Sequence, residues 1–182
     1  MLRKVLTITL LFATLAMFGQ QAYVKSYTIT VAGTSNIHDW ESQVSSCTGS
    51  CQMILDENQK VSINQLQVKI PVENIISDHD LMDTKTWACF ESDKYPYITF
   101  RAKHVRFDAG IAYFSGTLKM HGVTKQVTFP CKYTFHDGVI VFKGSYAIDM
   151  VDYQMDPPSL MMGAISVGPI VTVHFNVEYK IS

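Results

Sequence analysis

The stretch SDHDLMDTKTWACFESDKYPYITF, Ser77 to Phe100, interrupts a sequence whose other segments mostly alternate between apolar and polar residues. Ser77 and Asp80 fit the S-x-x-D pattern of a helix start, in which the serine oxygen caps a free amide. Pro96 marks a place where a helix cannot continue. We therefore expect one short helix over about residues 78–91. A helix of this length is not stable alone in water and has to pack its apolar side on other elements.

The segments around this helix have the period-two alternation that is typical of strands. Short turn sequences such as Asp-Gly separate them, and these predict β-hairpins. The rhythm indicates an all-β protein with an antiparallel sandwich or barrel, and a single helix among the strands commonly closes the end of a barrel. Strands are expected at residues 24–31, 36–47, 52–55, 61–72, 97–107, 111–118, 124–135, 139–150 and 170–179.

The N-terminus has the pattern of a secretory signal peptide. Two basic residues precede an apolar run that is shorter than the roughly 20 residues of a membrane span, and small or polar residues follow. We assign residues 1–22 to the signal peptide and residues 23–182 to one domain, with cleavage after Gly19, Gln20 or Ala22. The protein is therefore expected to be exported, to a periplasm or to the outside of the cell.

Composition limits the function classes. The whole chain has 15 basic and 16 acidic side chains, and loss of the two basic residues of the signal peptide leaves 13 and 16, a formal charge of −3. No basic stripe is present, which argues against nucleic-acid binding. Hydrophobic residues make up 47% of the chain, which is ample for a core.

Four cysteines, Cys47, Cys51, Cys89 and Cys131, leave the disulfide pairing open. Export permits disulfides. If Gly49 turned a hairpin, Cys47 and Cys51 could bond. If the strand continued, they would lie on one face about 13 Å apart, at roughly 3.3 Å per residue. Free buried thiols are the remaining alternative.

The segment at residues 150–166 contains four methionines and two adjacent prolines. The prolines exclude a central strand. The segment is either a long loop that tucks its methionines beneath itself or a flexible apolar lip at the mouth of a pocket.

Four motifs spread over most of the chain point to one family. They are GTSNIHDWE at residues 33–41, LMD at 81–83 with KYPYITF at 94–100, GTL at 116–118 with HGVTK at 121–125, and GAI at 163–165 with VG at 167–168. With these motifs in this order, the chain resembles the YceI-like family of exported, lipocalin-like proteins that bind polyisoprenoid lipids.

The resemblance implies an extended eight-stranded antiparallel barrel with an apolar tunnel and a helix beside its mouth. It implies a long isoprenoid chain, such as a quinone tail, as the bound small molecule, and it implies neither catalytic residues nor a covalent cofactor. Transient contact with a membrane surface and a homodimer are further expectations for such a protein.

A barrel of eight strands can either fill itself with side chains or hold one slender ligand. The strands offer a surplus of apolar positions for its interior: Ile63, Val68, Ile70, Ile98, Phe100, Phe114, Leu118, Phe129 and Phe142. The residues that we predict to contact a ligand are Trp40, Leu81, Met82, Trp87, Phe90, Phe100, Phe114 and Met162. Ordinary core packing is the alternative role for each of them.

Two alternatives to a lipid-binding barrel come from other classes. The adjacent pairs His38-Asp39 and His79-Asp80 could serve a hydrolase or a metal if they met at the barrel mouth. No histidine has the spacing of a known metal motif on one element, so we predict no metal site. A barrel filled by its own side chains would instead be a structural or interaction protein.

Overall fold

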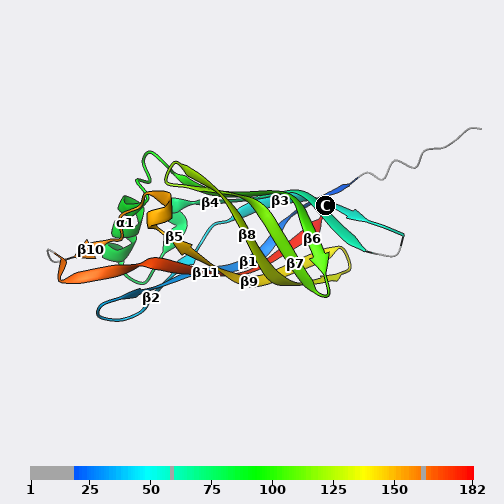
Figure 1. Ribbon diagram of the computed structural model, residues 1–182. Coiled ribbons are helices and arrows are strands. Elements are labelled where there is room, and N and C mark those ends of the chain that lie inside the picture. The colour runs from blue at the N-terminus through cyan, green and yellow to red at the C-terminus, as the bar shows by residue number, and fades with distance from the viewer. Residues whose placement is uncertain (1–18, 58–59, 161–162) are drawn as a thin grey trace, which may run out of the picture.

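Eight antiparallel strands close into an extended barrel in the computed structural model of the protein (Figure 1). The structure describes residues 19–57, 60–160 and 163–182. The barrel wall runs in the order β1, β3, β4, β6, β7, β8, β9 and β11, and β11 pairs with β1 to close it. The predicted eight-stranded barrel is therefore confirmed. The barrel strands are β1 Gln20–Ser35, β3 Thr48–Leu55, β4 Val61–Pro71, β6 Tyr97–Asp108, β7 Ile111–Met120, β8 Val123–His136, β9 Val139–Asp149 and β11 Ile165–Ile181.

Three tight hairpins build the wall from β6 to β9. The register pairs Asp108 with Ile111, Met120 with Val123 and His136 with Val139, so two residues form each loop. In the β7–β8 turn, His121 has φ 48° and Gly122 has φ 75°. Positive φ at both positions is the type I′ geometry that matches the twist of the strands. The hairpins predicted from these turn sequences are confirmed.

The predicted strand at residues 36–47 is divided in the structure. Only β2, Trp40–Val44, is a strand there, and β3 begins at Thr48 after a short break. β1 pairs with β3 near its start and with β2 near its end, so two strands in succession share one neighbour. The buried positions Ser42 and Val44 are two residues apart, but the next one, Cys47, follows after three, so the alternation changes phase at the break.

Short elements surround one end of the barrel, on the left of Figure 1. β5, Ile75–Ile76, pairs with β2, and β10, Ser159–Leu160, pairs with β11. These short elements are the 3-10 helices η1 Val72–Asn74 and η2 Val151–Tyr153, the strands β5 Ile75–Ile76 and β10 Ser159–Leu160, and the helix α1 Asp80–Cys89. Within the described residues, no helix is both long and apolar enough to cross a bilayer.

The predicted helix is present, but its start is held differently from our expectation. His79 is the N-cap residue and makes no capping bond through its side chain. Instead, the N–H and the hydroxyl of Ser77 both donate to Oδ1 of Asp83, each at 2.7 Å. Asp83 is buried, with 7% of its surface exposed. A buried carboxylate has to accept hydrogen bonds, and this demand decides the local geometry.

The barrel interior has a filled half and a hollow half. The filled half lies toward the start of β1 and the end of β11, and the other half lies toward α1. β1 begins at Gln20, and Ala22 is fully buried and paired with Ile181 of β11. The last residues assigned to the signal peptide are thus part of the barrel wall, and the cleavage position stays a prediction.

We expect Gly116→Ala to destabilise the barrel by about 1–3 kcal/mol, because a methyl group there overlaps backbone. An added Cβ would lie 2.2 Å from the carbonyl oxygen of Arg101 on β6. The matched control is Gly168→Ala, whose Cβ would meet the rotatable hydroxyl of Thr34 at 2.7 Å. Urea unfolding of the two variants measures the difference, and equal stabilities would contradict the close approach of β6 and β7.

Candidate functional site

A cavity of about 560 Å³ occupies the half of the barrel nearest α1. Its walls are almost wholly aliphatic and aromatic. Most of the polar lining side chains lie in or next to α1 or the β1–β2 connection. They are Ser35, His38, His79, Lys85 and Thr86. Ile37 and Leu81 also line the cavity and are 58% and 60% exposed, so the cavity reaches solvent there. We call this end, between α1 and the β1–β2 loop at residues 36–39, the mouth.

Aromatic rings cover one side of the cavity. Phe114 of β7 stacks on Phe129 of β8 with ring centroids 5.3 Å apart, and Phe129 contacts Tyr146 of β9 at 5.0 Å. Phe100 of β6 contacts Phe129 at 5.5 Å. The first two contacts join neighbouring strands, and the third joins β6 to β8 across β7. A wall built in this way gains contact energy between aromatic side chains while the bore stays open.

A few specific contacts hold α1 at the mouth. Trp87 donates its indole N–H to the carbonyl of Ile75 in β5 at 3.1 Å. Cys89 donates its Sγ–H to the carbonyl of Asp156 at 3.2 Å. With the Ser77–Asp83 bonds, these contacts tie both ends of the helix to the segments that surround the cavity.

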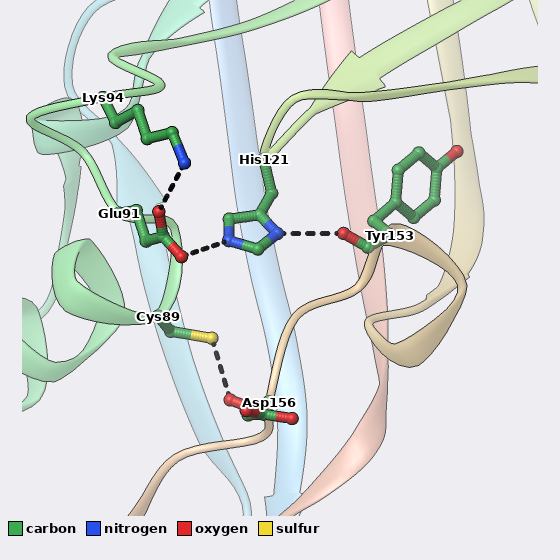
Figure 2. Close-up of polar contacts among 6 residues, drawn as sticks. All are labelled: Cys89, Glu91, Lys94, His121, Tyr153 and Asp156. Carbon is green, nitrogen blue, oxygen red and sulfur yellow. Dashed lines mark hydrogen bonds and ion pairs between the residues drawn. The ribbon is translucent and has the colours of Figure 1, made fainter.

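His121, in the β7–β8 turn, connects the end of α1 to η2 (Figure 2). Its Nδ1 lies 3.0 Å from the carbonyl oxygen of Tyr153, and its Nε2 lies 3.3 Å from Oε1 of Glu91. Lys94 in turn lies 3.6 Å from Oε2 of Glu91. A carbonyl and a carboxylate only accept hydrogen bonds, so His121 satisfies both when each ring nitrogen carries a proton. We call this set of contacts the His121 bridge.

The sequence matches the description of a YceI-like domain over residues 21–179. The chain belongs to the YceI-like family. The resemblance stated from the motifs is therefore confirmed. A search of curated protein sequences gave no match.

Solved structures with the same fold include members of this family. Burkholderia cenocepacia BcnA is 15% identical, with a TM-score of 0.68 over 84% of this chain and 95% of that one. A polyisoprenoid-binding domain from Saccharophagus degradans is 14% identical, with a TM-score of 0.67 over 88% and 98%. The Campylobacter jejuni YceI protein is 16% identical, with a TM-score of 0.58 over 100% and 99%. At these identities the likeness shows the shared YceI-like fold.

Six of the eight residues predicted to contact a ligand line the cavity: Trp40, Leu81, Met82, Phe90, Phe100 and Phe114. Trp87 lies outside the lining, because its indole points to β5 and makes the bond to Ile75. Met162 lies outside the described residues. Of the nine apolar strand positions proposed for the interior, only Ile63 is absent from the lining, and it is buried in the filled half.

Several lining residues were not among the predicted contacts. Tyr146, Ile148 and Met150 continue the inward alternation of β9 from Phe142, and this signal was available in the sequence. Met155 also lines the cavity and is 2% exposed. The described part of the methionine-rich segment therefore tucks its methionines inward, and they form part of the cavity wall.

The hydrolase alternative finds little support at the mouth. His38 and His79 both line the cavity, but Nδ1 of His38 contacts the backbone carbonyl of Asp39 at 2.9 Å, not its carboxylate. In the part of the chain that the structure describes, no group of three or more His, Cys, Asp or Glu side chains is placed to hold a metal ion. The alternative of a barrel filled entirely by its own side chains is also not supported, because half of the interior is a cavity.

The four cysteines are unpaired thiols. β3 runs straight through Gly49, so the hairpin that could have joined Cys47 to Cys51 does not form. Burial raises the pKa of Cys47 from 9.0 to about 11 and the pKa of Cys51 to about 12. Burial also raises the pKa of Cys131 to about 12, and burial with the nearby charge of Asp156 raises that of Cys89 to about 11. These thiols are neutral, and thus poorly nucleophilic, at neutral pH.

We expect the free energy of unfolding to fall as the pH rises above 9.0, toward about 12. Over this range the unfolded chain loses thiol protons that the folded protein retains. Because the folded protein then binds more protons than the unfolded chain, a rise in pH favours unfolding. Urea unfolding against pH measures the slope. Cys51→Ala is the comparison and should show a shallower fall, whereas an unchanged slope would contradict a buried neutral thiol.

We expect His121→Asn to speed hydrogen exchange of the α1 amides by about ten- to a hundredfold, from the loss of the two hydrogen bonds that the ring makes to Tyr153 and Glu91. Asn tolerates the positive φ of this turn, so the substitution removes the ring without straining the backbone. The control is His136→Asn, whose side chain is 89% exposed. Exchange in α1 that matches this control would show that the His121 bridge does not hold the helix.

Proposed function

We propose that the protein binds a long apolar or amphiphilic ligand, a polyisoprenoid or a lipid with a quinone-like tail, inside the barrel. The observation that carries this proposal is the apolar cavity of about 560 Å³ that reaches solvent at the mouth. Each ligand methylene that leaves water for such a site contributes roughly 0.8 kcal/mol. A long hydrocarbon chain would therefore bind tightly without a charged partner inside the bore.

Two further observations support the ligand class. The Saccharophagus degradans domain with the same fold is described as polyisoprenoid-binding. A hydrocarbon chain requires apolar surroundings. The deep part of the cavity supplies them, since it is lined by aliphatic and aromatic side chains, tyrosines among them. The proposed role is accordingly binding for transport or storage, without a chemical step.

We also propose that the protein is exported. The basic and apolar pattern of the first 18 residues supports this. Among the cleavage positions considered, a cut after Gly19 would keep β1 whole. A cut after Ala22 would remove a fully buried residue that pairs with Ile181.

The mouth offers a route for exchange with a membrane. Ile37 and Leu81 are large apolar side chains that are more than half exposed and continuous with the cavity lining. Transient contact of this rim with a lipid surface would let a ligand pass between bilayer and bore without crossing water. The homodimer considered from the sequence stays a prediction.

The test is to extract the purified protein with organic solvent and identify co-extracted lipids by mass spectrometry. We expect a lipid with a long apolar chain at up to one molecule per protein. Val173→Trp should reduce its amount by about tenfold or more, because the larger side chain occupies bore that the ligand would fill. Val173 lines the cavity.

The matched control is His174→Trp, which places the same side chain on the adjacent, exposed position of β11. Thermal unfolding of both variants checks that the barrel is intact. Wild-type protein from which no lipid is extracted, and which also fails to take up isoprenoid alcohols added to it, would overturn the proposal. Equal lipid in the two variants would place the ligand outside the bore.

A further inference from the structure

The cavity ends part-way along the barrel, because its lining stops before the far end of several strands. The innermost lining positions on four strands are Leu66 of β4, Phe114 of β7, Phe142 of β9 and Tyr179 of β11. We call these four residues the floor. The deep end of the cavity is thus closed, and the mouth is the opening that remains.

Tightly packed side chains lie beyond the floor. They are at most 5% exposed and absent from the cavity lining: Met53, Ile63, Ala112, Cys131 and Ile140. Ala112 and Ile140 precede Phe114 and Phe142 by two residues, so they are the next inward positions on the same strands. We call these five residues the plug.

Ring contacts fix the floor in place. Phe142 lies 5.0 Å from Phe114 and 6.2 Å from Tyr179 between ring centroids, both edge to face. On the plug side, Phe142 stacks on Phe107 at 6.4 Å. Phe142 is 2% exposed and Tyr179 is 1% exposed. Rings held from several sides in this way leave little freedom for the floor to retreat from a longer ligand.

We propose that this floor, and Phe142 above all, sets the length of hydrocarbon chain that the protein accepts. The ligand enters tail first, and its polar end stays at the mouth. The inference rests on the proposed function, that the cavity binds a long apolar ligand. It adds a limit on chain length and names the residues that impose it.

The cavity volume gives the expected limit. At about 30 Å³ for each water-sized group, a cavity of about 560 Å³ holds about 20 methyl or methylene groups, which is roughly four isoprene units. A longer chain has to leave its remaining units at the mouth. Those units gain less from binding because they stay partly in water.

The placement of charge along the cavity agrees with this orientation. His38, His79 and Lys85 are the lining residues able to carry a positive charge in the described part of the chain, and all three lie at the mouth. At the floor, the polar group is the hydroxyl of Tyr179, which points to the carbonyl of Gln67 at 3.5 Å. A hydrated or charged head group is therefore accommodated at the mouth and excluded from the floor.

The experiment measures the affinity of the purified full-length protein for isoprenoid alcohols that lengthen by one isoprene unit at a time, by displacement of a fluorescent apolar probe. Wild-type affinity should rise by about tenfold or more with each added unit and then level off near four units. The position of this plateau is the quantity that reports the floor.

Two variants should move the plateau in opposite directions. Phe142→Ala removes a ring close in size to one isoprene unit, so the plateau should come one unit later. Val177→Phe should bring it one unit earlier, because Val177 lines the cavity opposite Phe142 in the β9–β11 register. The control is Ile140→Val in the plug, which should leave the plateau unchanged.

The outcomes separate the inference from the proposed function. If wild-type protein binds none of the alcohols, the proposed function fails. If it binds them but the affinity rises without a plateau, or Val177→Phe leaves the plateau in place, the floor is overturned while lipid binding stands. If Phe142→Ala does not fold, as thermal unfolding would reveal, Val177→Phe decides the question alone.

Discussion

The pairing of β1 with β11 is the interaction on which the rest of the structure depends. It extends from Ala22 with Ile181 to Ser35 with Val167, and it joins the first strand of the barrel to the last. Without it, β1 and β11 would both be free edges with unpaired backbone groups. The inward apolar side chains would then face water on an open sheet. Cavity, mouth and floor exist because this ladder makes the wall continuous.

A closed barrel of this size can be filled or hollow. In this protein, one half of the barrel is filled by side chains and the other half is hollow. In the plug, small and medium side chains such as Ala112 and Ile140 are fully buried and lie outside the cavity lining. Toward the mouth, rings such as Phe129 and Tyr146 contact neighbours along the wall, so their packing energy does not require the bore to close. An unfilled apolar bore forgoes contact energy. A ligand chain can restore that energy, which links the hollow half to binding.

Alternation and turn residues predicted most of the strands, because period two and positive-φ turns are local properties of the sequence. They did not predict where the bore ends, since plug and lining positions are equally apolar and differ only in what they meet across the barrel. Trp87 illustrates the limit within α1, where large apolar side chains lie both toward the cavity and toward β5. The sequence also did not predict the His121 bridge, because the two partners of His121, Glu91 and Tyr153, lie 30 and 32 residues away in the chain.

The two parts of the site differ in how firmly they are held, and this bears on how a ligand could pass. The wall and floor consist of continuous strand ladders and interlocked rings, so opening them means breaking the barrel. α1 is held by a handful of contacts from Asp83, Trp87, Cys89 and His121. An element with few anchors opens locally at a much lower free energy than the fold as a whole. Since the deep end is closed, a proposed ligand would have to pass the mouth, and α1 is the element beside the mouth with these few anchors.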